Sequence, residues 1–580
     1  MRYFYAILLV IFTASATTSV FAQSTQTGTG GAVATVDEFA AQVGIRVLEE
    51  GGNAVDAAIA AAAVINVTQP FSAGIGGGGF MLVYLAEEDR VVTIDSREMA
   101  PLAATPDMFI DPETGESIPF RPERISSGLS VGVPGTLAGW QVALERYGTI
   151  SLAEALEPAI GLAEEGFEVN QVFHDQVEGN LERFEAFTST RDLFLPGGAP
   201  PEVGSTFTNP ELAETFRLIA EEGADIFYRG ELGEDVVAAV QRPPTVENPP
   251  FEVRPQAMTM ADLDLYNALV REPVSAEYRG YTVYGMAPPT SGGLTVGLIL
   301  NLLESSELSD LPRAEALHRM LEASRLAYAD RGAYMGDADF VNVPVEGLLS
   351  QDYADMRSTE ITLEALSDPA PGDPFAFQDD PSPPLGPPSE EDTESESTTH
   401  LVTADAQGNA VSFTTTIEQI GGSAIVVPGR GFLLNNELTD FDSDPVGPNA
   451  PEPLKRPRSS MSPTIVLEDG DLRVALGTPG GSTIITTVTQ ILLNVIDLEM
   501  SLPDAINAPR LSQRNGDDTT VEESVPEELL TELGVFGHTF SETDELGAAV
   551  GLFFTEEGAI VAAAEAERRG GGTARVVSPE

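Results

Sequence analysis

Two threonines at the ends of a predicted hairpin could bring two hydroxyls to one site. Thr398 begins an alternating run, a three-residue turn with Gly408 follows, and the return run ends at Thr416. If Asp405 pairs with Asn409 across the turn, Thr398 lies opposite Thr416, and directly opposed residues have Cβ atoms about 5 Å apart. Threonine pairs on strands are usually structural, so the pair alone does not establish catalysis.

A base for the Thr398 hydroxyl would exist if the chain were cut just before it. Cleavage of the Ser397–Thr398 bond releases an α-amine with an unperturbed pKa of about 8. Such an amine can take the hydroxyl proton and so activate a threonine nucleophile. We therefore expect the uncut chain to be catalytically silent.

Other segments supply groups that suit acyl transfer. Gly480 and Gly481 precede an apolar helical run over 484–495, and amides at a helix start can stabilise an oxyanion. Arg97 can bind a carboxylate through two hydrogen bonds. Taken singly, these features also fit a glycine turn and a surface ion pair. Paired hydroxyls and paired carboxylates complete the set, at Ser459, Ser460, Glu437 and Asp440.

Composition excludes several other chemistries. The 580 residues include no cysteine, which rules out thiolate nucleophiles and disulfides, and only four scattered histidines, so a histidine-rich metal centre is not expected. The formal net charge is −61, so nucleic acid would be repelled. Lys455 is the only lysine. This composition fits a protein that stays soluble in high salt, or a lineage bias toward arginine and acidic residues.

The N-terminus is typical of an export signal. Arg2 precedes an apolar run over 6–12, and small residues lead to a cleavage site after Ala22. The run is too short to span a bilayer, and no later stretch is apolar enough to do so. We expect residues 1–22 to be a signal peptide and the protein to be periplasmic or secreted, without a membrane anchor.

The elements that must position these groups alternate between strands and helices. A strand over 33–36 leads to a helix that begins after Asp37, and Asn53 caps a second helix that continues through Val64. A glycine run over 74–79 precedes a strand over 80–85. Without the lysine of a phosphate-binding loop, this run favours close backbone packing. Further helices are predicted over 152–165, 212–222 and 294–303, and a strand over 281–284.

The clearest boundary lies at 368–397. This stretch contains eight prolines, nine acidic residues and no basic residue, so it should bury no core and be a mobile, solvated tail. Order should return at Thr398. The remainder, 398–580, is predicted to contain hairpins, with helices after Gly481 and near Leu529.

Together these segments resemble the γ-glutamyltranspeptidase (γ-glutamyltransferase) family. The resemblance implies an N-terminal-nucleophile hydrolase of the α/β class, a four-layer αββα sandwich. It implies a precursor that cuts itself before Thr398 to give a heterodimer of a large subunit, 23–397, and a small catalytic subunit, 398–580. The matching stretches occur in family order through 30–515: 50–58, 76–80, 97–101, 133–136, 278–281, 289–293, 398–400, 434–436, 455–463 and 479–482.

The resemblance also implies roles for the candidates. Thr398 would attack the γ-carbonyl of a γ-glutamyl compound such as glutathione, with Thr416 orienting it and the Gly480 and Gly481 amides forming an oxyanion hole. The acyl-enzyme would pass to water or to the amine of an amino acid or dipeptide, without cofactor or metal. The implied substrate-binding residues are Arg97, Ser459 and Ser460 for the α-carboxylate, and Glu437 and Asp440 for the α-ammonium.

Two departures from the family pattern matter. Glu418 stands where many members have asparagine, and its carboxylate can still contact the ammonium. Only 18 residues separate Asp440 from Ser459, which predicts a short or absent lid and an open site that favours bulky donors, including polyglutamate. Two alternatives stay open. A related glutaryl (cephalosporin) acylase would not need Glu437 and Asp440, and an inactive acidic binding protein would stay uncut.

Overall fold

The computed structural model describes residues 24–379 and 397–579, with the Ser397–Thr398 bond intact. The predicted signal peptide and residues 380–396 of the predicted tail lie outside this part of the chain. No helix among the described residues is long and apolar enough to cross a membrane.

One curled antiparallel sheet of 13 strands forms the two inner layers. Its first half runs, in spatial order, β6 (Leu269–Arg271), β3 (Arg90–Asp95), β2 (Gly78–Leu85), β10 (Ala410–Thr416), β9 (Thr399–Asp405) and β1 (Thr25–Thr35), and β18 (Thr573–Pro579) also pairs with β1. The second half continues with β17 (Ile560–Ala564), β16 (Val550–Phe554), β12 (Asp471–Gly477), β11 (Thr464–Glu468), β8 (Tyr281–Gly285) and β7 (Val274–Tyr278).

Strand β1 joins the two halves of the sheet. Its first residues pair with β17, and its last residues pair with β9. The register shifts between Thr29 and Ala32, where Gly30 and Gly31 have φ values of 81° and 121°. Glycine takes such angles without steric cost, so the strand can change direction here and the sheet can curl.

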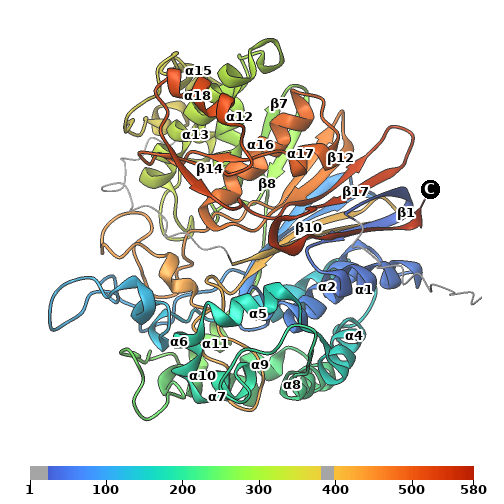
Figure 1. The fold of residues 1–580 in the computed structure, drawn as a ribbon, viewed down its shortest axis with the longest axis vertical. Coiled ribbons are helices and arrows are strands. Elements are labelled where there is room, and N and C mark those ends of the chain that lie inside the picture. The colour runs from blue at the N-terminus through green and yellow to red at the C-terminus, as the bar shows by residue number, and fades with distance from the viewer. Residues whose placement is uncertain (1–23, 380–396, 580) are drawn as a thin grey trace, which may run out of the picture.

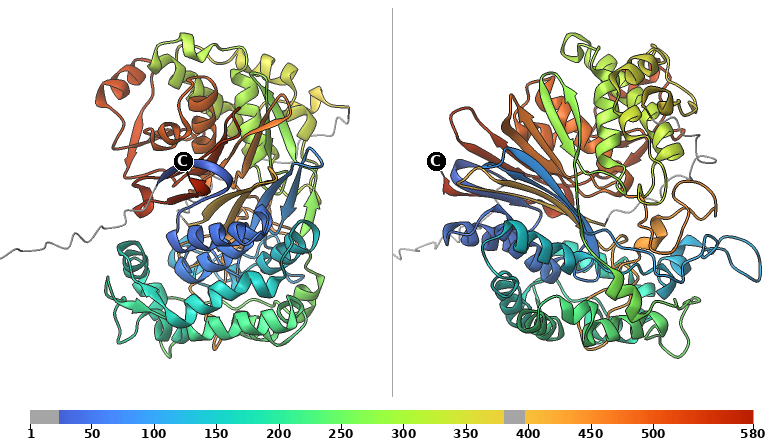
Figure 2. Two further views of the ribbon diagram at one scale, coloured as in Figure 1. Left: turned by 90° about the vertical axis from the view of Figure 1, so that its right-hand side faces the viewer. Right: turned by 180° about the vertical axis from the view of Figure 1, so that it is seen from behind.

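Helices cover both outer faces of the curled sheet (Figures 1 and 2). One outer layer holds α1 (Glu38–Glu49), α2 (Ala54–Thr68), α3 (Thr136–Tyr147), α4 (Leu152–Glu165), α5 (Gln171–Glu178), α6 (Leu181–Glu185), α7 (Thr188–Phe194), α8 (Pro210–Glu222), α9 (Asp225–Tyr228), α10 (Glu231–Gln241) and α11 (Met260–Leu265). The other holds α12 (Gly292–Leu303), α13 (Arg313–Tyr334), α14 (Val345–Leu348), α15 (Gln351–Ser358), α16 (Ile484–Ile496), α17 (Leu502–Asn507) and α18 (Glu527–Val535). The predicted four-layer αββα sandwich is confirmed.

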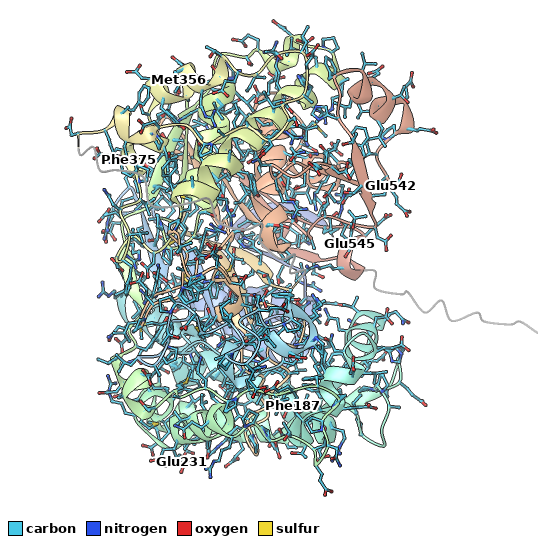
Figure 3. All side chains as sticks on the ribbon, turned by 90° about the vertical axis from the view of Figure 1, so that its left-hand side faces the viewer. Phe187, Glu231, Met356, Phe375, Glu542 and Glu545 are labelled. Atoms are coloured by element: carbon cyan, nitrogen blue, oxygen red, sulfur yellow. The ribbon has the colours of Figure 1, made fainter. Side chains whose placement is uncertain are left out.

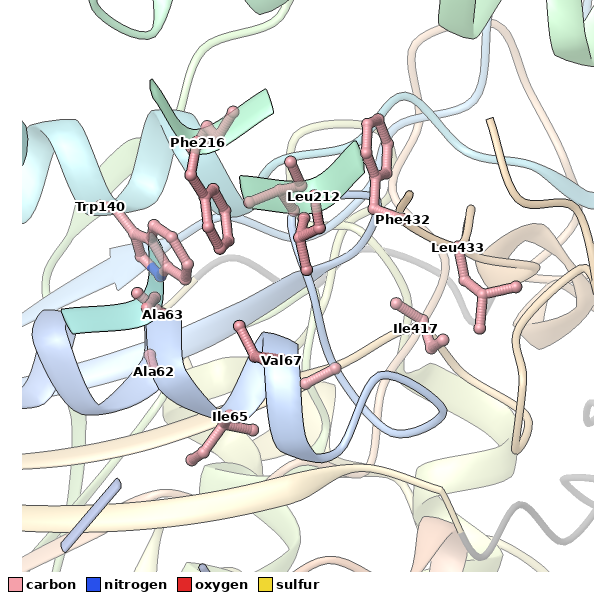
Figure 4. Close-up of a cluster of buried hydrophobic side chains, with 14 of the residues drawn as sticks. Ala62, Ala63, Ile65, Val67, Trp140, Leu212, Phe216, Ile417, Phe432 and Leu433 are labelled. Carbon is pink, nitrogen blue, oxygen red and sulfur yellow. The ribbon is translucent and has the colours of Figure 1, made fainter. Parts of the chain in front are cut away.

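Alternation along the strands separates two cores. Met81 and Val83 of β2 belong to the cluster that includes α2, whereas Phe80 and Leu82 belong to the cluster that includes α12 and α16. Successive strand side chains point to opposite faces, so one strand serves both. Every residue of α2 is buried. Figure 4 shows its side chains beside Trp140 and Phe216. Each fully buried large apolar side chain contributes about 1.5–3 kcal/mol.

Most predicted elements are present, with some different ends. Asp37 caps α1 through the amide of Ala40, and Asn53 forms a capping box with Asp56. However, β1 starts at Thr25 instead of 33, and α2 continues past 64. The remaining strands form two small sheets: β4 (Phe167–Glu168) with β5 (Thr206–Phe207), and β13 (Leu511–Ser512) with β14 (Thr519–Glu522) and β15 (Phe540–Thr543).

The prediction that the solvated tail begins at residue 368 is wrong. Residues 374–377 form a 3₁₀ turn, and Phe375, which Figure 3 labels, is buried edge-on against Tyr334. The amide of Gly372 donates to Asp330 Oδ1 at 2.7 Å. The segment therefore contacts α13 through Gly372 and Phe375. The average composition of the stretch hid its two phenylalanines, which favour burial although the acidic residues around them do not.

Candidate functional site

The β9–β10 hairpin places the two threonines as the sequence predicted. Thr399 pairs with Thr415 and Ala404 with Ala410, a register that puts Thr398 opposite Thr416. Their Oγ1 atoms are 3.1 Å apart, and both residues are buried. Gly408 has a φ of 89° in the turn, the conformation that a three-residue hairpin loop requires. The hairpin therefore holds two hydroxyls in contact.

Thr398 has an unusual backbone conformation. Its φ is 87°, which is sterically unfavourable for a β-branched residue and has to be held by its surroundings. The guanidinium of Arg569 donates to the Thr398 carbonyl at 3.0 Å, and the Ser397 hydroxyl donates to the Phe71 carbonyl at 3.2 Å. The backbone is thus strained next to the Ser397–Thr398 bond, and hydrogen bonds hold it on both sides of that bond.

The glycine run packs against this hairpin, as predicted. A Cβ on Gly77 would lie 2.0 Å from the carbonyl oxygen of Thr416, and one on Gly76 would lie 2.0 Å from that of Leu433. A side chain at either position would displace the backbone. The glycines therefore allow β2 and the loop before it to pack closely against β10, next to Thr416.

Arg97, Glu437 and Asp440 form a charge cluster, in which the Asp440 side chain is 27% exposed. Glu437 and Asp440 lie on one 3₁₀ turn, and Arg97 forms an ion pair with each, at 2.5 Å to Asp440 Oδ2. The Arg97 and Glu437 side chains are each 1% exposed. The guanidinium also donates to the carbonyls of Pro457 and Arg458. Arg97 therefore does not form a surface ion pair, and Glu437 does not lie on a solvated face.

Burial and like charges shift the pKa values in this cluster. Burial raises the pKa of Glu437 to about 7, against the lowering effect of Arg97. Burial, followed by the charges of Asp440 and Glu437, raises the pKa of Glu418 well above its usual value. Burial alone would lower the pKa of Arg97, but the two carboxylates raise it. The guanidinium stays charged, while carboxyls that face one another resist full ionisation.

Glu418 lies directly beside the threonine pair. Its backbone amide donates to Thr416 Oγ1 at 2.9 Å, and its buried carboxylate accepts from Thr439 Oγ1 at 3.2 Å. Asn436 and Gln419 donate to the same carboxylate. Glu418, which departs from the family pattern, therefore belongs to the cluster, and neutral donors hold its carboxylate.

The serine and glycine candidates come from two other segments of the chain. Ser460 Oγ accepts from Arg331 at 2.9 Å, and Ser459 Oγ accepts from the Met461 amide at 3.1 Å. Gly480 and Gly481 have φ values of 141° and 56° in the turn that begins the 3₁₀–α16 helical segment. Such angles expose successive amides in a way that residues with side chains rarely allow.

One hollow of about 40 Å³ brings the candidates together. Of the ten predicted residues, all but Gly480 line it. Four lining residues were not predicted: Arg458, Met461, Ser482 and Ile484.

Two groups of side chains among the described residues have metal-ligand spacing, and neither includes a residue of this hollow. His318 Nδ1 and His538 Nε2 are 2.8 Å apart near Glu322, while His174 lies on the surface with two acids of α5. Burial lowers the pKa of His538 to about 4, and it also lowers the pKa of His318. A hydrogen bond joins the two rings of the first group.

Comparison with known proteins identifies the family. The family described as Gamma-glutamyltranspeptidase matches residues 40–576. A glutathione hydrolase proenzyme of Bacillus subtilis (strain 168) is 42% identical over 516 residues, which are 88% of this chain and 86% of that protein. The chain belongs to the γ-glutamyltranspeptidase family.

Solved structures agree with this assignment. The cephalosporin acylase from Bacillus halodurans matches with a TM-score of 0.83 at 28% identity, covering 98% of this chain and 99% of that one. The Helicobacter pylori gamma-glutamyltranspeptidase matches with a TM-score of 0.52 at 38% identity, covering 56% and 90%. The fold is thus shared by members named for different activities, and the site residues must decide between them.

Sequence reasoning missed groups that reach the site from distant segments. Arg569 contacts Thr398 from 171 positions away, and Arg331 reaches Ser460 from α13. Neither arginine lies in one of the stretches that carry the family resemblance. Only the β1–β18 pairing and the α13 packing bring them near, and no local sequence signal indicates that.

The segment between Asp440 and Ser459 folds back on itself. The Asn449 side chain donates to the Asp440 carbonyl at 2.7 Å and to Asp442 Oδ1 at 3.1 Å. Val446, at the tip, is exposed. The segment is therefore a short loop, as the sequence predicted. That the site of the processed protein is open stays a prediction.

Proposed function

We propose that the protein is a γ-glutamyltransferase and glutathione hydrolase that activates itself by cleaving the Ser397–Thr398 bond. The observation that carries this proposal is the contact of 3.1 Å between the Thr398 and Thr416 hydroxyls beside the cluster of Arg97, Glu437 and Asp440. The products of cleavage would be a large subunit, 23–397, and a small subunit, 398–580. Export, with loss of residues 1–22, belongs to the same proposal.

Cleavage creates the base that the nucleophile needs. Attack of Thr398 Oγ1 on the Ser397 carbonyl carbon would break the amide C–N bond, which frees the Thr398 amine and leaves the acyl group as an ester on Oγ1. Hydrolysis of that ester would release the Ser397 carboxylate and restore the Thr398 hydroxyl. In the uncut chain this nitrogen is an amide and cannot accept a proton. The strained φ of Thr398 supports this step, because breaking the bond releases the constraint.

The charge cluster suits the amino-acid end of a γ-glutamyl donor. Its α-carboxylate would bind Arg97 with Ser459 and Ser460, and its α-ammonium would bind Glu437 and Asp440. Before a donor binds, the guanidinium forms an ion pair with each of the two carboxylates. A zwitterionic donor brings one charge of each sign, so it can replace these contacts without leaving a buried charge unpaired.

The chemical steps then follow from the positions of the groups. The Thr398 amine takes the hydroxyl proton as Oγ1 attacks the γ-carbonyl carbon, and Thr416 orients that hydroxyl. The Gly480 and Gly481 amides stabilise the oxyanion, and the leaving amine takes the proton. The resulting ester on Thr398 passes its acyl group to water or to an acceptor amine.

Processing and turnover test the proposal together. Purified wild-type protein should separate into two chains under denaturing conditions, one about twice the length of the other, with the smaller beginning at Thr398. Thr398→Ala should remain one chain, and Thr398→Ser should still cleave. An uncut wild-type protein that is inactive on γ-glutamyl-p-nitroanilide would instead support the binding-protein alternative.

The acylase likeness gives a second candidate function. The structural match to the cephalosporin acylase favours it, but Glu437 and Asp440 would have no ammonium to bind in a glutaryl substrate. Side-by-side turnover of γ-glutamyl- and glutaryl-p-nitroanilide separates the two functions. Turnover of the glutaryl compound alone would replace the γ-glutamyl assignment.

A further inference from the structure

Three buried side chains that can bind a metal meet where α13 contacts α18 and the segment after it (Figure 1). His318 and Glu322 lie one turn apart on α13, and His538 follows α18. One ligand atom from each residue lies within 4.8 Å of the other two, and none of the three residues is more than 5% exposed. No local pattern indicates this group, because 220 positions separate its two histidines.

The surroundings of His318 fix the nitrogen that it can offer to a metal. Its Nε2 lies 2.7 Å from the Thr362 carbonyl oxygen, which can only accept, so in the neutral ring Nε2 carries the proton and Nδ1 carries a lone pair. The ring also stacks on Phe536, with centroids 4.5 Å apart. A carbonyl that accepts from the second ring nitrogen is the usual support of a histidine ligand. The lone pair on Nδ1 faces His538 Nε2, 2.8 Å away.

The hydrogen bond between the rings leaves two buried acceptors without a donor. When His538 Nε2 donates to His318 Nδ1, the other ring nitrogen of His538 holds a lone pair, and it has no partner among the described residues. Glu322 Oε1 is also buried without a hydrogen bond, whereas Oε2 accepts from the Leu366 amide at 2.6 Å. Buried acceptors that lack donors destabilise a fold. A cation bound among these atoms would satisfy lone pairs that the protein's own donors do not.

One positive charge lies near Glu322. Arg325 Nε is 3.6 Å from Glu322 Oε1, which is an ion pair but too long for a hydrogen bond. Arg325 Nη1 donates to the Gly516 carbonyl at 2.8 Å. The guanidinium is thus held by a partner of its own, and an ion can reach Oε1 without breaking a hydrogen bond.

We propose that His318, Glu322 and His538 bind one Zn²⁺ ion. Two imidazoles and one carboxylate are a common zinc ligand set, whereas Mg²⁺ and Ca²⁺ prefer oxygen ligands alone. The facing nitrogens would separate from 2.8 Å to about 3.3 Å, the spacing of two ligands that lie about 2.0–2.1 Å from a tetrahedral zinc. The proton on His538 Nε2 would move to Nδ1, and water would take the fourth position.

The position of the group gives the ion an entry route and a structural role. A hollow of about 1150 Å³ is lined by Leu366, whose amide bonds Glu322, and by Gly537, which precedes His538. The ion and its water can enter from this hollow. Residues 318 and 322 belong to the predicted large subunit and residue 538 to the small one, so the ion would join the two. The three ligands already lie together in the uncut chain, and the inference therefore does not depend on the proposed function.

Metal content, absorption and thermal stability test the inference on the purified full chain. Wild-type protein that is stripped with a chelator, incubated with Zn²⁺ and desalted should retain one Zn²⁺ per chain of 580 residues or its cleaved equivalent. Its melting temperature should rise by a few degrees, because a ligand of the folded state stabilises that state. Co²⁺ should give the visible absorption of a tetrahedral site. Glu322→Gln and His538→Gln should each lose the retained ion, the absorption and the shift in melting temperature.

Controls place the ion and keep the test separate from the proposed function. His174→Gln changes the surface group on α5 and should retain the ion, the absorption and the shift. Uncut Thr398→Ala should also bind one Zn²⁺, so failure of self-cleavage would leave this test intact. Wild-type protein that retains no Zn²⁺ would overturn the inference, as would equal retention by wild type, Glu322→Gln and His538→Gln. A cooperative melt of each variant without metal shows that it is folded, and Glu322→Gln, which keeps the shape of the side chain, decides if His538→Gln is not.

Discussion

Thr416 can be tested at the level of a single hydroxyl. Thr416→Val keeps the shape and removes the group that lies 3.1 Å from Thr398 Oγ1 and accepts from the Glu418 amide. We expect kcat to fall about 10- to 100-fold with little change in KM, because a hydrogen bond to the reacting hydroxyl is lost. Thr282→Val, on the surface of β8, is the matched control. Unchanged kcat in Thr416→Val would remove Thr416 from the mechanism.

Glu437 predicts the pH dependence of donor binding. Burial raises its pKa to about 7, so the carboxylate is ionised above that pH and protonated below it. Only the ionised form attracts the donor ammonium. The donor KM should therefore rise as the pH falls from 8 to 6, and Glu437→Gln should show a high KM with a flatter profile. The same pH dependence in wild type and Glu437→Gln would assign the titration to another group.

Residue types and the hairpin register predicted most of the residues that line the hollow. The register follows from a turn whose glycine needs positive φ, so Thr398 and Thr416 could be paired from sequence alone. The ion pairs of Arg97 could not be predicted from sequence, because they depend on where a 3₁₀ turn 340 positions later meets the segment that follows β3. Arg331 and Arg569 were missed for the same reason, because their contacts with Ser460 and Thr398 are long-range and carry no local pattern.

At the scale of elements, the loop that leads into β2 can be probed with matched glycine substitutions. Gly77→Ala would place a Cβ 2.0 Å from the Thr416 carbonyl, so it should lower the melting temperature and slow self-cleavage by displacing β10. Gly161→Ala in α4 meets no atom within 4 Å and should stabilise by about 0.5–1 kcal/mol. Thermal melts and a cleavage time course check both. Equal effects of the two variants would contradict the packing argument.

The ends of elements were harder to predict than their existence. Capping side chains located the starts of α1 and α2, because a side-chain oxygen that bonds free amides leaves a local signature. The length of β1 has no such local signature, because residues 25–32 form a strand only through pairing with β17 and β18. The buried Phe375 likewise depends on Tyr334, which is distant in the sequence.

For the whole molecule, the curled sheet explains why the two predicted subunits must form one body. β9 and β10 of the smaller part lie between β1 and β2 of the larger part, with ladders on both sides. Cleavage before Thr398 breaks none of these ladders. The two products should therefore remain associated after processing and separate only on unfolding, which size-exclusion chromatography of the cut protein can check.

The net charge of −61 predicts how stability depends on salt. Like charges on a compact molecule repel one another, and unfolding relieves that repulsion by separating them. Salt shortens the range of the repulsion, since the Debye length falls from about 10 Å at 0.1 M to about 3 Å at 1 M. The melting temperature should therefore rise by several degrees between these NaCl concentrations, and most steeply at the low end. Sucrose is the control, because it strengthens burial without screening charge and should give a gradual increase. A melting temperature that is flat or falling in NaCl would show that the acidic surface does not destabilise the fold, and would favour lineage bias over adaptation to high salt.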